Sequence, residues 1–147
     1  MPLPELPERA VEIGAVVSDW RSAVRLTGLV LERSGAATPA YADEMVRMIE
    51  EHGPYVVIAP GLALAHARPG PAVLADGLAI VTLAEPVNFG HPHNDPVSVV
   101  LGLAINSSGA HLAAVADLAN VFNDSNAIQA LAAATSVAEV QAIMGGS

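Results

Sequence analysis

An apolar run from Val97 to Ile105 constrains the fold more than any other feature of the sequence. Only Ser98 and Gly102 interrupt it. A strand with one solvated face alternates apolar and polar residues, so a run without that alternation predicts a strand covered on both faces. The sheet that contains this strand must therefore carry packed elements on each side.

Helix and strand signals alternate along the rest of the chain. Further strands are expected at residues 11–17, 56–59 and 78–83, and helices at 18–33, 39–52 and 109–122, with two short helices after Ser125 and Ser136. We expect Ser18 to cap the first helix and Pro39 to occupy the first turn of the second. The pattern predicts an α/β fold with a mixed β-sheet flanked by helices on both faces, in one domain spanning residues 1–147.

The composition narrows the classes of function. Hydrophobic residues make up 52% of the chain and charged residues 14%, which is typical of a compact globular protein. A net charge of −9 repels nucleic acid but would attract a basic protein partner. The absence of cysteine excludes disulfides and thiolate metal sites within the chain. The sequence shows neither a secretory signal nor an apolar stretch long enough for a membrane span, so we expect the cytoplasm.

The candidate chemistry lies in the segment from Ala59 to Pro69. If this segment is extended, one side carries Leu62, Leu64, His66 and Arg68, and the other carries Ala63, Ala65 and Ala67. Imidazole is nucleophilic near pH 7 because its ordinary pKa is about 6.5. A guanidinium two residues further on can neutralise phosphoryl oxygens. The pair predicts a phosphoryl-accepting histidine, and the alternative interpretation is a structural histidine in an apolar segment.

The segment from Gly53 to Pro69, GPYVVIAPGLALAHARP, resembles the active-site signature of phosphotransferase-system (PTS) enzyme IIA proteins. These form the mannitol/fructose superfamily, and its ascorbate-type branch is the most similar. The G-P-Y, A-P-G-L-A and H-x-R-P elements occur here in that branch's order. Asn94-Asp-Pro-Val97 and the His111-Leu helix start also resemble the family, so the resemblance runs from about residue 11 to residue 144.

The resemblance implies a function and its partners. His66 matches the phosphorylated histidine, and His111 matches a second histidine that assists phosphate binding. The donor implied is the phosphohistidine carrier HPr, the acceptor is a cysteine of a cognate enzyme IIB, and a membrane IIC is involved only indirectly. An ascorbate- or pentitol-like substrate follows from the branch. We expect neither a cofactor nor a metal. The sequence does not decide whether the protein forms a homodimer.

His111 also has a physical argument of its own. It lies in the first turn of the expected helix that follows Asn106-Ser-Ser-Gly109. Helix N-termini attract anions through unpaired N–H groups and the macrodipole. We therefore predict that His111 and Arg68 stabilise a phosphoryl group on His66.

Two departures from the family pattern are visible. Ala65 stands where members usually have proline before the histidine, a change that costs roughly 0.4–1 kcal/mol of preorganisation and removes no reacting group. Mannitol and fructose types carry an Arg-Glu pair on the preceding helix, whereas Arg47, Glu50 and Glu51 occupy a different register here. We do not expect Arg47 in the site.

The sequence also allows other interpretations. A regulatory IIA-type module would use the same histidine to control protein binding. His91, His93 and His111 could hold a metal in a hydrolase, although a polar loop explains the first two more simply. Asn94 and Asp95 either border the phosphate site or form an Asx turn before Pro96.

Overall fold

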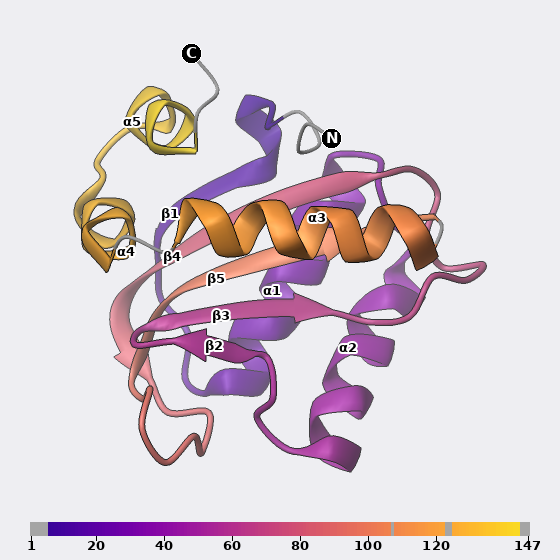
Figure 1. Cartoon of the computed structure of the whole chain (residues 1–147), viewed down its shortest axis with the longest axis horizontal. Helices are drawn as coiled ribbons and strands as arrows, with labels where there is room; N and C mark the ends of the chain where they lie inside the picture. Colours follow the sequence, from indigo (N-terminus) through magenta and orange to yellow (C-terminus); the bar gives the residue numbers. More distant parts are fainter. Residues whose placement is uncertain (1–5, 107, 123–124, 145–147) are drawn as a thin grey trace.

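The computed structural model describes residues 6–106, 108–122 and 125–144. A five-stranded sheet lies between helices (Figure 1). In chain order, the elements are a short 3₁₀ helix at Glu8–Ala10, β1 at Val11–Ala15, α1 at Trp20–Arg33, α2 at Pro39–His52, β2 at Val57–Ala59, β3 at Leu62–His66, β4 at Gly77–Val87, β5 at Val97–Ala104, α3 at Ser108–Val121, α4 at Ser125–Ala133 and α5 at Val137–Ile143.

The sheet is mixed and has the strand order β1-β4-β5-β3-β2. The central strand is β5, which pairs antiparallel with β4 and parallel with β3. Every residue of β5 except Ser98 is buried. The apolar run is therefore buried on both faces, as the sequence predicts, and the structure places it in the middle of the sheet.

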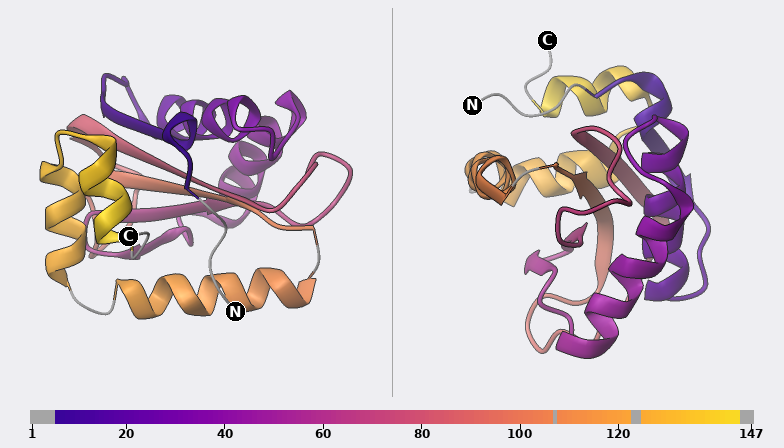
Figure 2. Two further views of the ribbon diagram at one scale, coloured as in Figure 1. Left: turned by 90° about the horizontal axis from the view of Figure 1, so that it is seen from above. Right: turned by 90° about the vertical axis from the view of Figure 1, so that its right-hand side faces the viewer.

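Helices cover both faces of this sheet, and each face has its own hydrophobic cluster (Figure 2). The first cluster contains the inward side chains of α1 and α2, such as Leu31 and Met45. The second contains those of α3, α4 and α5, such as Leu118 and Leu131. The predicted fold class, a mixed sheet with helices on both faces, is confirmed.

The beginning of α1 differs from the prediction. The N-cap is Asp19, not Ser18: its carboxylate accepts the backbone N–H of Ser22 at 2.8 Å. This hydrogen bonding lowers the pKa of Asp19. Ser18 lies one residue outside the helix, where its hydroxyl pairs with the Ser22 hydroxyl at 3.2 Å. Serine and aspartate are both favoured at N-cap positions, so residue preference alone could not distinguish Ser18 from Asp19.

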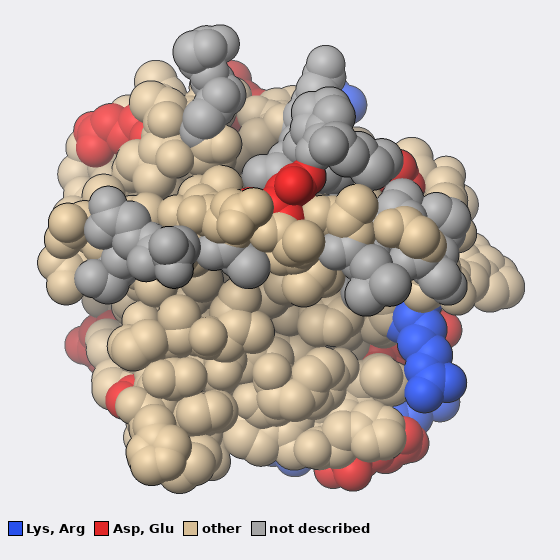
Figure 3. Space-filling model, viewed as in Figure 1, with Lys and Arg blue, Asp and Glu red and all other residues tan. Residues whose placement is uncertain are grey.

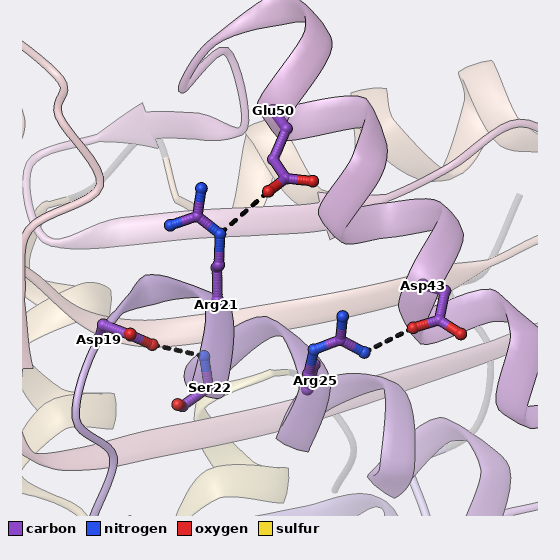
Figure 4. Close-up of polar contacts among 6 residues, drawn as sticks. All are labelled: Asp19, Arg21, Ser22, Arg25, Asp43 and Glu50. Carbon is purple, nitrogen blue, oxygen red and sulfur yellow. Dashed lines mark hydrogen bonds and ion pairs between the residues drawn. The ribbon is translucent and has the colours of Figure 1, made fainter.

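Small residues let α1 and α2 pack closely. A Cβ added at Gly28 of α1 would stand 2.5 Å from the Cβ of Ala42 in α2. Two ion pairs tie the outer faces of the same helices, Arg21 with Glu50 and Arg25 with Asp43 (Figure 4). All four side chains are largely exposed, so these pairs add little stability compared with the buried contact.

Candidate active site

Strand β3 carries His66 to the end of the sheet. The alternation is as predicted: Ala63 and Ala65 belong to the α1/α2 cluster, and Leu62 and Leu64 belong to the α3–α5 cluster. His66 follows the leucines, so it faces the α3–α5 side, and it is only partly exposed. The segment is extended from Leu62 to His66, which is the condition for the alternation, although no strand was predicted at these residues.

The small residues beside His66 serve close packing of α1 on the sheet. Ala65 pairs with Gly102 of β5. A Cβ added at Gly102 would meet Thr27 Cγ2 at 2.5 Å and Leu31 Cδ1 at 3.1 Å. The strand pair next to His66 is therefore held rigidly against α1, which gives the histidine a fixed platform.

The buried hydroxyl of Tyr41 in α2 fixes the backbone just beyond His66. It accepts the N–H of Ala67 at 3.0 Å and donates to the carbonyl oxygen of Leu103 at 2.7 Å. His66 and Leu103 are partners in the β3–β5 register. Burial raises the pKa of Tyr41 to about 12, so the hydroxyl keeps its proton near neutral pH. One side chain thus joins α2 to the ends of both strands.

The imidazole of His66 is oriented by its own strand. Its Nδ1 lies 2.8 Å from the carbonyl oxygen of Leu64. A carbonyl only accepts, so Nδ1 carries the proton and Nε2 carries the lone pair in the neutral ring. Burial lowers the pKa of His66, and the hydrogen bond to Leu64 opposes this effect. The geometry therefore favours a neutral imidazole with Nε2 as the nucleophilic atom.

Tyr55 lies against this imidazole. The two ring centroids are 5.6 Å apart and the planes are almost perpendicular, at 88°. On its other side Tyr55 contacts His52 at 6.4 Å, again edge to face. Burial raises the pKa of Tyr55, and the nearby Arg68 charge opposes the rise. Sequence reasoning noted Tyr55 only within the G-P-Y element and missed its contact with His66.

Arg68 lies just beyond the end of β3 and is exposed. It lines a hollow of about 350 Å³ together with Arg47, Glu44 and Glu51 from α2. In Figure 3 basic and acidic side chains lie next to each other at one edge of an otherwise mostly uncharged face. Arg47, which we did not expect in the site, thus borders the same hollow as Arg68.

The beginning of α3 lies at the same end of the sheet as His66. Leu103, the register partner of His66, precedes the start of α3 at Ser108 by five residues. Figure 1 shows the β3 arrow pointing toward the side of the sheet on which the first turn of α3 lies. His111 falls in the first turn of α3, as expected, but its side chain lies outside the described part of the chain.

Asn94 and Asp95 are placed at the other end of β3. The Gly61 N–H donates to the Asn94 carbonyl oxygen at 3.0 Å. Gly61 lies five residues before His66, and five residues of extended chain span about 16 Å. The Asp95 carboxylate accepts the backbone N–H groups of Phe89, Gly90 and His91. The structure does not bring either residue to His66. An Asx turn would accept an N–H two residues later, whereas the Asp95 carboxylate accepts N–H groups four to six residues earlier, so these hydrogen bonds do not form the Asx turn before Pro96 either.

His91 of this loop has a structural role. Nδ1 of His91 accepts the backbone N–H groups of His93 and Asn94, at 3.1 and 3.0 Å. Among the described residues, no group of three or more histidine, aspartate or glutamate side chains is arranged to hold a metal ion.

The family is decided by comparison with known proteins. Residues 6–145 match the model of the phosphoenolpyruvate-dependent sugar phosphotransferase system EIIA 2 family. The chain belongs to this family. PTS IIA components are phosphoryl-transfer proteins, so the chain is a phosphotransferase. The family and the enzyme class predicted from the sequence are confirmed.

Individual relatives of this chain are also PTS IIA proteins. The ascorbate-specific PTS system EIIA component of Escherichia coli K12 is 32% identical over 133 residues, which cover 90% of this chain and 86% of that protein. The mannitol IIA of Escherichia coli, solved in complex with phosphorylated mannitol IIB, is 25% identical, with a TM-score of 0.86 over 99% of this chain and 100% of that one. The nitrogen regulatory protein IIA-Ntr of Neisseria meningitidis is 27% identical, with a TM-score of 0.80 over 94% of each chain.

Within the described residues, the IIA chain has no helix long and apolar enough to cross a membrane.

Proposed function

We propose that this IIA protein is a phosphoryl carrier that accepts phosphate from phospho-HPr on Nε2 of His66 and passes it to a cysteine of a cognate enzyme IIB. The observation that supports this most is the hydrogen bond from Nδ1 of His66 to the Leu64 carbonyl oxygen, at 2.8 Å. It fixes the tautomer that leaves Nε2 as the nucleophile. The family match supports the class of reaction.

Each half of the reaction is a displacement at phosphorus. In the first, the Nε2 lone pair attacks, a new N–P bond forms, and the N–P bond to the donor histidine breaks. In the second, the cysteine thiolate attacks, an S–P bond forms, and the electron pair of the broken N–P bond returns to Nε2. Such transfers depend mainly on positioning and on charge stabilisation.

The surroundings of His66 can supply both requirements. Phosphorylation of Nε2 makes the ring cationic while Nδ1 keeps its proton, and the Leu64 carbonyl then accepts a charge-assisted hydrogen bond. The N-terminal end of α3 supplies N–H groups and a favourable dipole for the phosphoryl oxygens. We assign Arg68 and His111 the role of stabilising those oxygens.

The sugar is proposed from the relatives. The Escherichia coli protein at 32% identity is named ascorbate-specific. We therefore propose ascorbate, or a pentitol-like compound, as the substrate of the transport system that this carrier serves. The carrier itself would meet protein surfaces rather than sugar, and membrane IIC would be reached only through IIB.

Phosphotransfer in a reconstituted system tests the proposal. The protein is incubated with enzyme I, HPr and labelled phosphoenolpyruvate, beside His66→Ala and the control His52→Ala. We expect acid-labile label on wild type and on His52→Ala, and none on His66→Ala. Label that survives in His66→Ala would refute the assignment.

The likeness to IIA-Ntr favours one alternative, a regulatory module whose phosphorylation at His66 controls protein binding. Transfer from the phosphorylated protein to an ascorbate-type IIB separates the two functions. A carrier loses its label to the IIB cysteine within a catalytic cycle, whereas a regulator keeps it.

A further inference from the structure

Among the described side chains, Tyr55 packs its aromatic ring against the imidazole of His66. The perpendicular arrangement, at a centroid separation of 5.6 Å, lies within the range that aromatic pairs prefer. Tyr55 is 39% exposed, so part of its ring is withdrawn from water by this contact and by His52. An aromatic ring placed beside a nucleophile limits the positions that the nucleophile can adopt.

The backbone holds Tyr55 at this place. Gly53 ends α2 with a φ of 86°, a conformation that glycine adopts readily. The Tyr55 N–H then donates to the Gly53 carbonyl oxygen at 2.8 Å. The next residue, Val56, accepts the N–H of Leu64 at 2.7 Å. The Leu64 carbonyl oxygen also accepts the hydrogen bond from Nδ1 of His66. The backbone around Leu64 is therefore connected both to Nδ1 of the imidazole and to the segment that carries Tyr55.

The contacts of the imidazole with Leu64 and Tyr55 restrain it in different ways. The hydrogen bond to Leu64 selects the tautomer, but this hydrogen bond by itself permits the ring to rock about its side-chain torsions. The Tyr55 ring, which packs against the imidazole, prevents this movement. Because phosphoryl transfer needs reacting atoms about 3–3.5 Å apart and in line, a displacement of about 1 Å costs on the order of 100-fold in rate.

We propose that Tyr55 is a positioning residue for His66, which holds the imidazole so that Nδ1 stays on the Leu64 carbonyl and Nε2 is presented to the incoming phosphoryl group. This inference rests on the proposed function of His66. The aromatic ring, not the hydroxyl, does the positioning. Tyr55→Phe should therefore behave like wild type, and Tyr55→Ala should not.

A partly exposed tyrosine beside a reacting group could instead serve as a docking contact for the partner proteins. A small phosphoryl donor separates the two roles. Phosphoramidate carries a P–N bond and needs no protein surface: Nε2 attacks phosphorus, and the leaving group departs as ammonia after taking a proton from water. Loss of a docking contact would leave this reaction unchanged.

The experiment compares wild type, Tyr55→Ala, Tyr55→Phe and the control Ile58→Ala. Ile58 is similarly exposed, at 43%, and comes from the neighbouring β2. The rate of His66 phosphorylation is measured with phosphoramidate and with phospho-HPr. We expect a loss of about 10- to 100-fold with both donors for Tyr55→Ala, and less than about 2-fold for the other two variants.

A ¹⁵N NMR titration of the His66 ring gives a readout independent of phosphorylation. The wild-type ring should show the single Nδ1–H tautomer, and Tyr55→Ala should show a mixture. In the wild type, burial lowers the pKa of His66. In Tyr55→Ala water should reach the ring, so the pKa of His66 should rise. Tyr55 contacts the ring, the Tyr41 hydroxyl binds the N–H of the next residue, Ala67, and Arg68 follows two residues after His66. Ile58→Ala changes none of these groups.

The outcomes separate clearly. Unchanged phosphoramidate rates and an unchanged tautomer in Tyr55→Ala would overturn the positioning role, and a loss confined to phospho-HPr would identify docking instead. A wild type that neither donor phosphorylates would refute the proposed function, and the role of Tyr55 with it. If Tyr55→Ala does not fold, Tyr55→Leu replaces it, because leucine keeps apolar bulk but lacks the flat ring.

Discussion

The substitution Tyr41→Phe tests how the end of β3 is held. The hydroxyl accepts the Ala67 N–H at 3.0 Å and donates to the Leu103 carbonyl at 2.7 Å, and all three residues are buried. Its removal leaves the Ala67 donor without this partner in a site that water does not reach. A buried unsatisfied donor costs about 1–3 kcal/mol. We expect the free energy of unfolding to fall by about 2 kcal/mol.

Urea denaturation followed by circular dichroism measures this loss. The midpoint should fall at an unchanged slope, and the melting temperature should drop by roughly 4–8 °C, since a domain of this size loses about 2–4 °C per kcal/mol. Tyr55→Phe is the matched control, because its hydroxyl has no hydrogen bond to the ends of β3 and β5. A loss below about 0.5 kcal/mol for Tyr41→Phe would refute the bridging role.

High pH gives a second check on the same group. The folded pKa of Tyr41 is about 12, above the ordinary value of 10.0. Between these values the unfolded chain releases the proton and the folded chain does not, so this contribution to stability is complete below pH 10 and is lost as pH rises towards 12. The stability difference between wild type and Tyr41→Phe should narrow over that interval. A constant difference would contradict the assignment.

Three further predictions concern the cap, the sheet and the nucleophile. Asp19→Ala should cost about 1 kcal/mol in thermal unfolding and Ser18→Ala almost nothing, because only the Asp19 carboxylate caps α1; equal losses would contradict the assigned cap. Gly102→Ala should cost about 1–3 kcal/mol in urea denaturation, because the new methyl group meets Thr27; wild-type stability would show that the helix yields without cost. The rate of His66 phosphorylation by phosphoramidate should stay at its plateau below pH 6.5, since burial lowers the pKa of the attacking ring; half-maximal rate above pH 6.5 would contradict that environment.

Local patterns were sufficient to predict the main frame of the fold. The run at Val97–Ile105 lacks polar alternation and forms the central strand, and the alternation through Ala63 and Leu64 places the two kinds of side chain on opposite faces. These signals depend on neighbours in the sequence alone. The cap of α1 was missed by one residue because two adjacent residues both favour that position.

The surroundings of His66 depend on contacts between distant parts of the chain, which local patterns do not carry. Tyr55 reaches the imidazole from the segment that joins α2 to β2. Arg47 of α2 borders the hollow that Arg68 lines beyond the end of β3. Asn94 lies at the far end of β3 because β3 and β5 run parallel, a pairing that the sequence did not specify. The motif was sufficient to predict His66 as the nucleophile, whereas the environment of this side chain depends on the topology.

Heteronuclear NMR of the phosphorylated protein tests the central claim most directly. The protein is labelled with ¹⁵N-histidine, phosphorylated by enzyme I, HPr and phosphoenolpyruvate, and examined for coupling between phosphorus and a ring nitrogen. We predict one acid-labile phosphoryl group on Nε2 of His66, with the proton retained on Nδ1. Phosphorus bonded to Nδ1 of His66, or to another residue, would contradict the account.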